Sequence, residues 1–331
     1  MNVTIIGSGS WGCAFGRHLA LRLHQVQVVT QTSTEATQLN RSHSNPHFLP
    51  DVALPAEMRF VDLENADLSD CELLVYAVPT QVMRQVARWA APRRPEGSLQ
   101  LSLAKGLELG TIKRPSEVIA EETGGVVAAL SGPNHAEEVS RDLPSATVIA
   151  CADSLVVAAL QTAVTSDTFR VYTNTDIIGV EFCGAAKNPI AIACGMSDGL
   201  GYGDNSRASL ITRSLAEIAR LGTEMGARLE TFAGLAGIGD LIATCTSRHS
   251  RNRRAGELLA GGESAERVEA LIGQVVEGIP TAYALVDMAS GFGIELPVIE
   301  NVQQVLAQGK SPADCVRSLM GRVATREGGA I

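Results

Sequence analysis

The chain has 331 residues, which is long for a single hydrophobic core and fits two domains of about 100–200 residues each. Hydrophobic residues make up 45% and charged residues 19%, a composition that indicates a folded aliphatic protein and excludes a disordered or fibrous one. The formal net charge of -9 excludes a broadly basic surface, and we therefore expect no nucleic acid as a partner.

Seven cysteines are scattered singly along the chain, with no CxxC pair and no histidine at metal-ligand spacing. This pattern favours a reducing cytoplasm and predicts no structural zinc or other metal site. The chain enters a predicted strand at once, without the basic and apolar regions of a signal peptide. The most apolar stretch, residues 177–196, is interrupted by charges and by Pro189, so we expect a buried helix and no membrane span.

The first half of the chain alternates β-branched runs with helical patterns, which predicts a parallel, doubly wound sheet. Strands are predicted at Val3–Ile6, Val26–Val29, Leu73–Ala77, Leu99–Leu103, Val126–Leu130 and Thr147–Ala150. After about Asp176 only helical patterns follow, at residues 177–196, 206–226, 251–260, 264–274, 281–292, 298–308 and 312–321. The predicted fold class is therefore α/β, with a Rossmann-like N-terminal domain of residues 1–175 and an all-helical domain of residues 176–331.

A glycine-rich turn, Gly7-Ser8-Gly9-Ser10-Trp11-Gly12, joins the first predicted strand to a helix. In the dinucleotide-binding fingerprint the first glycine permits a tight turn, the second lets the backbone approach the pyrophosphate, and the third allows helix and strand to pack closely. The helix N-terminus then faces the phosphates. A turn without a ligand is the alternative, but the flanking strand and helix favour a bound dinucleotide. Residues 40–55, the longest irregular stretch, are expected to cover it.

The end of the second predicted strand, Thr30-Gln31-Thr32, is where the choice of dinucleotide is expected to be made. An acid there binds the free 2′-hydroxyl of a ribose, and an arginine accommodates a 2′-phosphate. Gln31 is neither, so NADH and NADPH both stay open as the cofactor.

Lys187 is the candidate catalytic residue, because it lies in a stripe of small and apolar residues on the predicted helix 177–196. Glu181 is six positions away and cannot pair with it along the helix. A desolvated lysine has a lowered pKa, which suits a general acid or base. A snorkelling lysine, or one paired with a distant carboxylate, is an equally good interpretation of the helix pattern alone. Glycines and aspartates from Gly195 to Asp204 favour a ligand nearby.

A basic run in this acidic chain, Arg248-His249-Ser250-Arg251-Asn252-Arg253-Arg254, enters a predicted helix that Ser250 can cap. Backbone N–H groups, the helix dipole and arginine side chains together suit a phosphate. A solvated basic face is the alternative. However, cations at a helix N-terminus oppose the helix dipole, and this opposition favours a bound anion.

These three features, in this order, resemble the bacterial-type NAD(P)-dependent glycerol-3-phosphate dehydrogenases, and the similarity runs from Val3 to about Arg322. The matching segments are Gly7-Ser8-Gly9-Ser10-Trp11-Gly12, Ser102-Leu103-Ala104-Lys105-Gly106-Leu107-Glu108, Leu130-Ser131-Gly132-Pro133, Ala186-Lys187-Asn188, Gly237-Ile238-Gly239-Asp240-Leu241, Ser250-Arg251-Asn252-Arg253-Arg254 and Val275-Val276-Glu277-Gly278.

The resemblance implies an oxidoreductase that interconverts dihydroxyacetone phosphate and sn-glycerol 3-phosphate with NADH or NADPH and supplies glycerol 3-phosphate for phospholipid synthesis. Lys187 would be the proton acceptor in alcohol oxidation, and no metal would be needed. The implied substrate residues are Lys105, Gly132, Asn134, Lys187, Asp240, Ser250, Arg251 and Asn252. The implied cofactor residues are Gly7, Gly9, Ser10, Trp11, Gly12, Gln31, Lys105, Ala136, Arg251, Val275 and Glu277. The expected partner is a small phosphorylated substrate, and a homodimer is the candidate assembly.

The chain departs from the family pattern at four places: Gln31 stands for an arginine, Asn134-His135 for a Ser/Thr-Phe pair, Pro189 for an aliphatic residue and Pro280 for a basic one. Two other functions stay open. One is a β-hydroxyacid-type dehydrogenase on another small anionic substrate, because arginine also binds a carboxylate. The other is a non-catalytic dinucleotide sensor, which the departures at Gln31, Asn134 and Pro189 leave open.

Overall fold

The computed structural model describes residues 1–323, and these form two compact units. Unit 1 comprises residues 1–104 and 114–177, and unit 2 comprises residues 105–113 and those from 178 onward. The segment Lys105–Lys113 thus joins the helical unit, although it comes from the middle of the α/β half of the chain. We retain the division into domains of residues 1–175 and 176–331 as a proposal. Residues 324–331 of the second domain lie outside the described residues.

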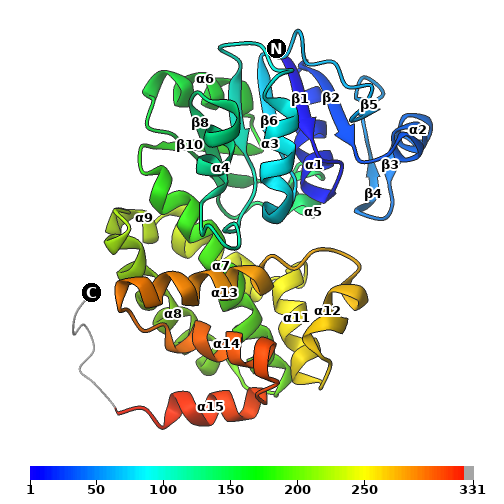
Figure 1. Ribbon diagram of the computed structural model, residues 1–331. Coiled ribbons are helices and arrows are strands. Elements are labelled where there is room, and N and C mark those ends of the chain that lie inside the picture. Colours follow the sequence, from blue (N-terminus) through cyan, green and yellow to red (C-terminus); the bar gives the residue numbers. More distant parts are fainter. Residues whose placement is uncertain (324–331) are drawn as a thin grey trace. The chain divides into compact units, whose positions relative to one another are not determined.

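Unit 1 consists of alternating strands and helices. Its strands are β1 (Asn2–Ile6), β2 (Gln25–Thr30), β3 (Ser44–Asn45), β4 (Leu49–Ala53), β5 (Arg59–Asp62), β6 (Leu73–Tyr76), β7 (Leu99–Ser102), β8 (Val127–Ser131), β9 (Ser145–Ala150) and β10 (Phe169–Asn174). Its helices are α1 (Ser10–Ala20), α2 (Ser33–Ser42), η1 (Thr80–Val82), α3 (Met83–Ala90), α4 (Pro115–Thr123), α5 (Ala136–Val139) and α6 (Ser154–Val164). Within residues 1–323 the main sheet has eight strands in the order β10-β9-β8-β7-β6-β1-β2-β5 (Figure 1). The six predicted strands are all confirmed, to within two residues at each end.

Both faces of the main sheet are buried, because successive residues of a strand point to opposite faces. Val3 and Ile5 of β1 belong to a core cluster that also contains Phe15 of α1. Ile6, the next residue of β1, belongs to a second cluster that contains Met83 of α3. Helices therefore cover the sheet on both sides, which confirms the doubly wound fold class.

The sheet is mostly parallel, as predicted, and its last two strands run opposite to the others. From β5 to β8 neighbouring strands are parallel, but β9 is antiparallel to β8 and β10 is parallel to β9. The connection from β8 to β9 contains only the four-residue helix α5. A four-residue helix is only about 6 Å long, so this connection lacks the crossover helix that usually joins two parallel strands.

The edge strands β5 and β10 were not predicted. β10 reads Phe-Arg-Val-Tyr-Thr-Asn and alternates buried with exposed side chains, and β5 has only four residues with a charge at each end. A strand as short as β5, or one as exposed as β10, lacks the continuous apolar run that marks a strand covered on both faces.

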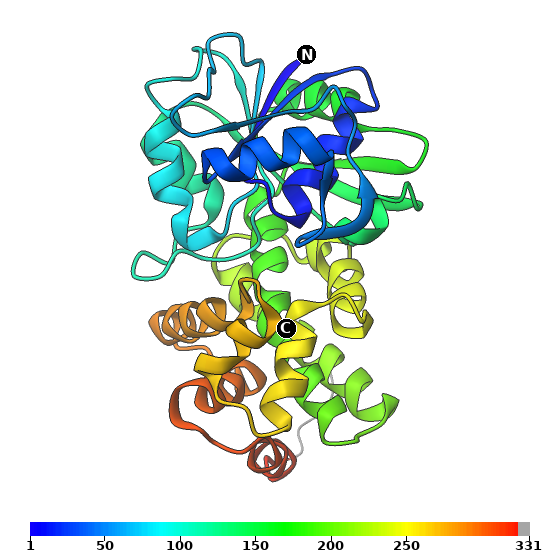
Figure 2. The ribbon, with the colours of Figure 1, turned by 90° about the vertical axis from the view of Figure 1, so that its right-hand side faces the viewer.

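The irregular stretch predicted at residues 40–55 forms the end of α2 and the β3–β4 hairpin, which contacts the glycine-rich turn. Asn45 Nδ2 donates to the Ser8 carbonyl at 2.8 Å, and Ser10 Oγ donates to the Phe48 carbonyl at 2.5 Å. In Figure 2 the blue segment with α2 and the hairpin faces the viewer. The hairpin therefore holds the turn in place from outside the sheet.

Unit 2 is helical. Its helices are α7 (Ile177–Gly199), α8 (Asp204–Glu224), α9 (Leu229–Phe232), η2 (Leu235–Gly239), α10 (Asp240–Thr246), α11 (Arg251–Ala260), α12 (Ala265–Ile272), α13 (Gly278–Phe292), α14 (Pro297–Gln308) and α15 (Pro312–Met320). The seven predicted helices are confirmed as α7, α8 and α11 to α15. The sequence analysis missed α9 and α10, because a glycine-rich segment at residues 234–239 interrupts their helical pattern.

Helix α7 is the core of unit 2, as predicted, and its residues Gly179 to Ser197 are buried all round. Its side chains belong to two core clusters on its different sides. By length and composition the helix could cross a membrane, but 89% of its most apolar window is buried within the protein. Pro189 lies inside α7 without ending it, although it has no N–H for the Ala185 carbonyl.

Helices α7 and α11 touch through their backbones. A Cβ atom added to Gly195 of α7 would lie 1.9 Å from the Arg253 carbonyl oxygen. A Cβ atom added to Gly256 of α11 would lie 2.0 Å from the Ile192 carbonyl oxygen. Both neighbours are backbone atoms, so only glycine at these two positions permits this approach.

Replacing Gly195 by alanine should lower the free energy of unfolding by about 2 kcal/mol or more, because the helices must move apart. The matched control is Gly291→Ala in α13, where an added Cβ meets nothing within 4 Å. The control should raise stability by about 0.5–1 kcal/mol, the usual gain of alanine over glycine inside a helix. Thermal denaturation of both variants checks this, and similar Tm shifts would contradict the close contact.

Candidate active site

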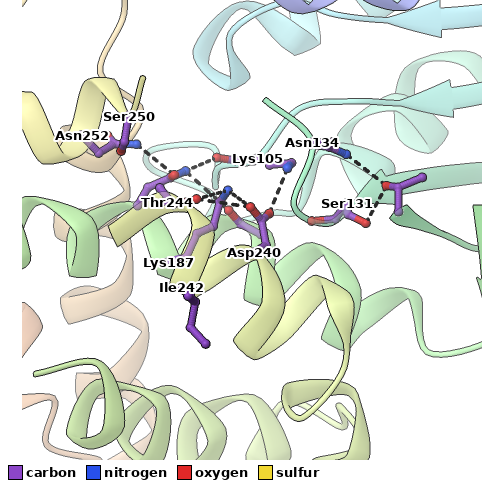
Figure 3. A network of polar contacts seen from close by, with 12 residues as sticks. Lys105, Ser131, Asn134, Lys187, Asp240, Ile242, Thr244, Ser250 and Asn252 are labelled. Carbon is purple, nitrogen blue, oxygen red and sulfur yellow. Dashed lines mark hydrogen bonds and ion pairs between the residues drawn. The ribbon is translucent and has the colours of Figure 1, made fainter. Parts of the chain in front are cut away.

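Two lysines of unit 2 meet at one buried carboxylate, that of Asp240 at the start of α10 (Figure 3). Lys187 Nζ donates to Asp240 Oδ1, and Lys105 Nζ donates to Asp240 Oδ2 at 2.9 Å. Asp240 is 2% exposed and Lys187 is 6% exposed. Charges this deep are stable only when paired. With both lysines protonated, the cluster carries one more positive charge than negative.

Thr244, one turn after Asp240, completes the surroundings of the Lys187 ammonium. Lys187 Nζ donates to Thr244 Oγ1 at 2.7 Å, and the Thr244 hydroxyl donates to Asp240 Oδ1 at 3.2 Å. These two acceptors take two N–H groups of Lys187, so its third position carries a proton in the ammonium form and a lone pair in the amine form. Thr244 was not predicted as a site residue, although its spacing of four from Asp240 places both side chains on one helix face.

The environment brings the proton affinity of Lys187 close to neutral pH. Its pKa is lowered from 10.5 to about 7, chiefly by burial and also by the charge of Lys105, while Asp240 acts in the opposite direction. Burial alone would raise the pKa of Asp240, but the two ammonium groups outweigh burial and lower it. A lysine that exchanges its proton near pH 7 beside a carboxylate that stays ionised is suited to general acid–base catalysis.

A chain of amide hydrogen bonds extends from this cluster to α11 and α13. Asn188 Nδ2 donates to the Lys105 carbonyl at 2.7 Å, and Asn252 Nδ2 donates to Asn188 Oδ1 at 2.9 Å. The Gly278 backbone N–H then donates to Asn252 Oδ1 at 2.9 Å. The backbone groups at both ends fix the orientation of the two amides, so Asn188 and Asn252 are held rigidly beside the lysines.

The N-terminus of α11 has the predicted Ser250 cap, because Ser250 Oγ accepts a bond from the Arg253 N–H at 3.2 Å. The interpretation of the whole basic run as an anion site needs correction at Arg253. Its guanidinium forms ion pairs with Asp198 at 2.7 Å and with Glu257 at 2.9 Å. Arg253 therefore stabilises unit 2 from within, and Ser250, Arg251 and Asn252 stay as the candidate anion-binding residues.

Arg251 connects α11 to the segment before α13. Its Nη1 donates to the Val275 carbonyl at 3.0 Å, and Glu277 is the N-terminal cap residue of α13. Three residues that the resemblance assigns to the cofactor, Arg251, Val275 and Glu277, thus lie in one region of unit 2.

In unit 1 the three glycines of the turn fit the dinucleotide fingerprint. Gly7 has a φ of +114°, and a Cβ there would lie 2.5 Å from the Ala77 carbonyl oxygen. A Cβ at Gly12 would lie 1.9 Å from the Gly7 carbonyl oxygen, so the third glycine is needed for packing. A Cβ at Gly9 meets nothing within 4 Å, which is the open approach that a pyrophosphate requires. The turn therefore fits a dinucleotide.

Ser10 and Trp11 use their side chains within unit 1. The Ser10 hydroxyl bonds to the hairpin, and the Trp11 ring packs on Phe15 and Phe169 with centroid distances of 5.9 and 6.3 Å. Both residues begin α1, so their backbone N–H groups are among those that a dinucleotide phosphate can meet. Gln31 is exposed just after the end of β2.

Gly132, Asn134 and Ala136 follow the carboxyl end of β8. Gly132 has a φ of +146°, and Ala136 begins α5. Asn134 Nδ2 donates to Thr147 Oγ1 at 3.0 Å, and Thr147 Oγ1 donates to the Ser131 carbonyl at 2.9 Å (Figure 3). The family departure at Asn134 is thus accommodated by a hydroxyl partner on β9.

The residues assigned by the resemblance therefore form two groups. Unit 1 holds Gly7, Gly9, Ser10, Trp11, Gly12, Gln31, Gly132, Asn134 and Ala136. Unit 2 holds Lys105, Lys187, Asp240, Ser250, Arg251, Asn252, Val275 and Glu277. Between residues 1 and 323, no group of three or more His, Cys, Asp and Glu side chains is arranged to hold a metal ion.

Known proteins match the chain along most of its length. Residues 2–157 match the profile described as NAD-dependent glycerol-3-phosphate dehydrogenase N-terminus, and residues 176–317 match the profile of the C-terminus of the same family. A crystal structure of glycerol-3-phosphate dehydrogenase from Coxiella burnetii aligns with a TM-score of 0.91 and 34% identity, covering 97% of this chain and 99% of that one. D-mandelate dehydrogenase, at 13% identity and a TM-score of 0.65, shares the fold.

Curated relatives are more similar in sequence. Glycerol-3-phosphate dehydrogenase (NAD(P)+) of Moorella thermoacetica is 48% identical over 330 residues, covering 98% of this chain and 97% of the relative. The enzyme named glycerol-3-phosphate dehydrogenase (NAD(P)+) 2 of Mycobacterium tuberculosis is 44% identical over 325 residues, covering 97% and 96%. On the strength of both profiles and these full-length relatives, the chain belongs to the NAD-dependent glycerol-3-phosphate dehydrogenase family.

Proposed function

We propose that the chain catalyses the interconversion of dihydroxyacetone phosphate and sn-glycerol 3-phosphate with NADH or NADPH, and so supplies glycerol 3-phosphate for phospholipid synthesis. The observation that carries this proposal is the buried Lys187–Asp240–Lys105 cluster in a member of this family. The fingerprint geometry of the glycine turn supports dinucleotide binding in unit 1.

Lys187 performs the proton transfer at the oxygen on C2 of the substrate. A bound nicotinamide supplies the hydride for reduction and accepts it in oxidation. In reduction the Lys187 ammonium gives its proton to the oxygen, and the carbonyl becomes a secondary alcohol by gaining one hydride and one proton. In oxidation the neutral amine accepts the hydroxyl proton. Asp240 and Thr244 hold two N–H groups of Lys187, and this leaves the third position for the substrate.

Lys105 and Asp240 set the charge around the reacting oxygen. When Lys187 has given up its proton, Lys105 and Asp240 still form a neutral pair at 2.9 Å. When Lys187 is protonated, the cluster has a net positive charge, which stabilises a developing alkoxide in a site sheltered from water. Lys105 therefore contributes electrostatically, through its ion pair with Asp240.

The substrate phosphate is held at the N-terminus of α11. Ser250, Arg251 and Asn252 lie there, where backbone N–H groups and the helix dipole favour an anion. The rigid Asn188–Asn252 pair links this region to Lys187. Binding energy from the phosphate thus positions the C2 oxygen. The other assignments that we propose are Gly132 and Asn134 for the substrate, and Gly7, Gly9, Ser10, Trp11, Gly12, Gln31, Lys105, Ala136, Arg251, Val275 and Glu277 for the dinucleotide.

Neither alternative function accounts for the site as well. A non-catalytic sensor has no need for a buried lysine with a pKa of about 7, and Pro189 leaves α7 intact around Lys187. A β-hydroxyacid substrate is disfavoured by the family of this chain's relatives. We also propose a cytoplasmic location, which seven thiol cysteines support, and a homodimeric assembly.

Replacing Lys187 by methionine should lower kcat for dihydroxyacetone phosphate reduction by about 100-fold or more, because the proton donor is lost. The fold should survive, because Lys105 still neutralises Asp240. Steady-state oxidation of the reduced dinucleotide measures the effect. The matched control is Lys310→Met, which removes a half-buried lysine that bonds to Asn301 and Gln304 of α14. Equal rates for Lys187→Met and the wild type would eliminate the proton-transfer role.

The pH profiles of the two directions should be opposite, because Lys187 changes charge near pH 7. Oxidation of glycerol 3-phosphate needs the amine, so kcat/KM should rise through about pH 7 and then level off. Reduction needs the ammonium, so kcat/KM should fall above about pH 7. The substrate phosphate also titrates in this range, and its effect on kcat/KM should appear equally in the residual activity of Lys187→Met. Dividing the wild-type profile by the profile of that variant therefore removes the phosphate contribution. Profiles that are flat in both directions would contradict the assignment.

Arg251→Ala should raise KM for dihydroxyacetone phosphate by about tenfold, because a charge-assisted contact to phosphate is removed. KM for unphosphorylated dihydroxyacetone should change little. Arg248→Ala, an exposed arginine of the same basic run, controls for the general loss of positive charge. Equal effects of Arg251→Ala on both substrates would remove Arg251 from the phosphate site.

A further inference from the structure

An acidic side chain contacts the glycine-rich turn from an unexpected place. Ser8, between the first two glycines, is 7% exposed, and its hydroxyl donates to Glu35 Oε1 at 2.5 Å. Glu35 lies in the first turn of α2. The Thr32 side chain caps that helix by accepting a bond from the Glu35 N–H at 3.2 Å, and this fixes the Glu35 backbone. Glu35 is therefore held at its backbone N–H and at one carboxylate oxygen.

The carboxyl ends of β2 and β5 carry further negative charge. Asp62 ends β5 directly beside Thr30 of β2, and the exposed Glu64 follows it. Residues 30–36 and 60–67 contain no lysine, arginine or histidine. The cation of β5 is Arg59, at its amino end, and the cation of α2 is Arg41, in its last turn. Each lies about 10 Å or more along its own element from the carboxyl ends of β2 and β5.

This edge of the sheet is where a dinucleotide-binding fold reads the adenosine ribose. An acid after the second strand accepts the ribose hydroxyls of NADH, whereas a cation there accommodates the 2′-phosphate of NADPH. Gln31 occupies the position after the second strand and is neither an acid nor a cation. Glu35 brings a carboxylate back to the turn from the next helix, and one bond from Ser8 leaves most of its acceptor capacity for a ribose.

We propose that Glu35 is the residue that selects the dinucleotide: it accepts the adenosine ribose hydroxyls and, with Asp62, repels a 2′-phosphate, so that the chain prefers NADH to NADPH. This inference rests on the proposed dehydrogenase function. A 2′-phosphate adds a charge of about -1.5 to -2 at neutral pH, and no cation of residues 30–36 or 60–67 offsets it.

The test is direct binding to the full chain without substrate, measured by the fluorescence of NADH and of NADPH. The wild type should bind NADH about tenfold more tightly than NADPH, or better. Glu35→Gln keeps an acceptor for Ser8 and removes the charge, so it should bind NADPH more tightly than the wild type and bring the ratio of dissociation constants toward one. A merely structural role for Glu35 would weaken both dinucleotides together.

Glu64→Gln is the matched control. It removes an exposed acid that follows β5, whereas the acid that bonds to the glycine-rich turn is Glu35. It should leave the ratio near the wild-type value. Equal wild-type affinities, a preference for NADPH, or an unchanged ratio in Glu35→Gln would each overturn the role of Glu35. Selective NADH binding without turnover of dihydroxyacetone phosphate would instead overturn the proposed function and support Glu35. Failure to bind either dinucleotide would overturn both.

Discussion

The chemistry of unit 2 depends on one ion arrangement, a buried carboxylate shared by two lysines. Asp240 would be strongly destabilising on its own, because an unpaired buried charge costs several kcal/mol. Lys105 and Lys187 each bond to a different oxygen of it. Without Asp240 the two ammonium groups would repel each other in a dry site, and at least one would lose its proton. With Asp240, each ammonium group has an ion-pair partner, and the pKa of Lys187 lies near neutral pH.

The backbone of unit 2 is shaped to hold this arrangement. Three separate segments supply its charged groups: the 105–113 loop, α7 and α10. Gly195 and Gly256 let α11 approach α7 to backbone contact, and this brings Asn252 within 2.9 Å of Asn188. Asn188 in turn binds the Lys105 carbonyl, so the glycine contact fixes the loop as well as the helices. A wider separation of the helices would loosen the Asn188–Asn252 bond and the bond from Asn188 to the Lys105 carbonyl together.

Sequence reasoning found the elements with strong periodic patterns and the residues whose chemistry is unusual for their surroundings. Lys187 stood out as a charge on an apolar helix, and the structure pairs it with a distant carboxylate, as one of the alternatives had it. The snorkelling alternative is wrong, because Lys187 is 6% exposed. That carboxylate could be assigned only through the resemblance, because 53 positions separate Asp240 from Lys187 and helix α10 gave no pattern of its own. The strand β5 was missed because it has only four residues with a charge at each end, and β10 was missed because half of its side chains are exposed. Glu35 was missed because its position on α2 says nothing about Ser8 until the helix is placed.

Two kinds of positive potential occur in this acidic chain. At the glycine turn the positive potential comes from the backbone at the start of α1, with Gly9 as the cap residue and no lysine or arginine in residues 7–12. At α11 and Asp240 it comes from side chains, namely Arg251, Lys105 and Lys187. A backbone site acts over about one turn of helix, whereas cationic side chains attract any phosphate that comes within a Debye length of about 10 Å. At the carboxyl ends of β2 and β5, residues 30–36 and 60–67 add no lysine, arginine or histidine to this backbone potential, and the proposed preference for NADH depends on that condition.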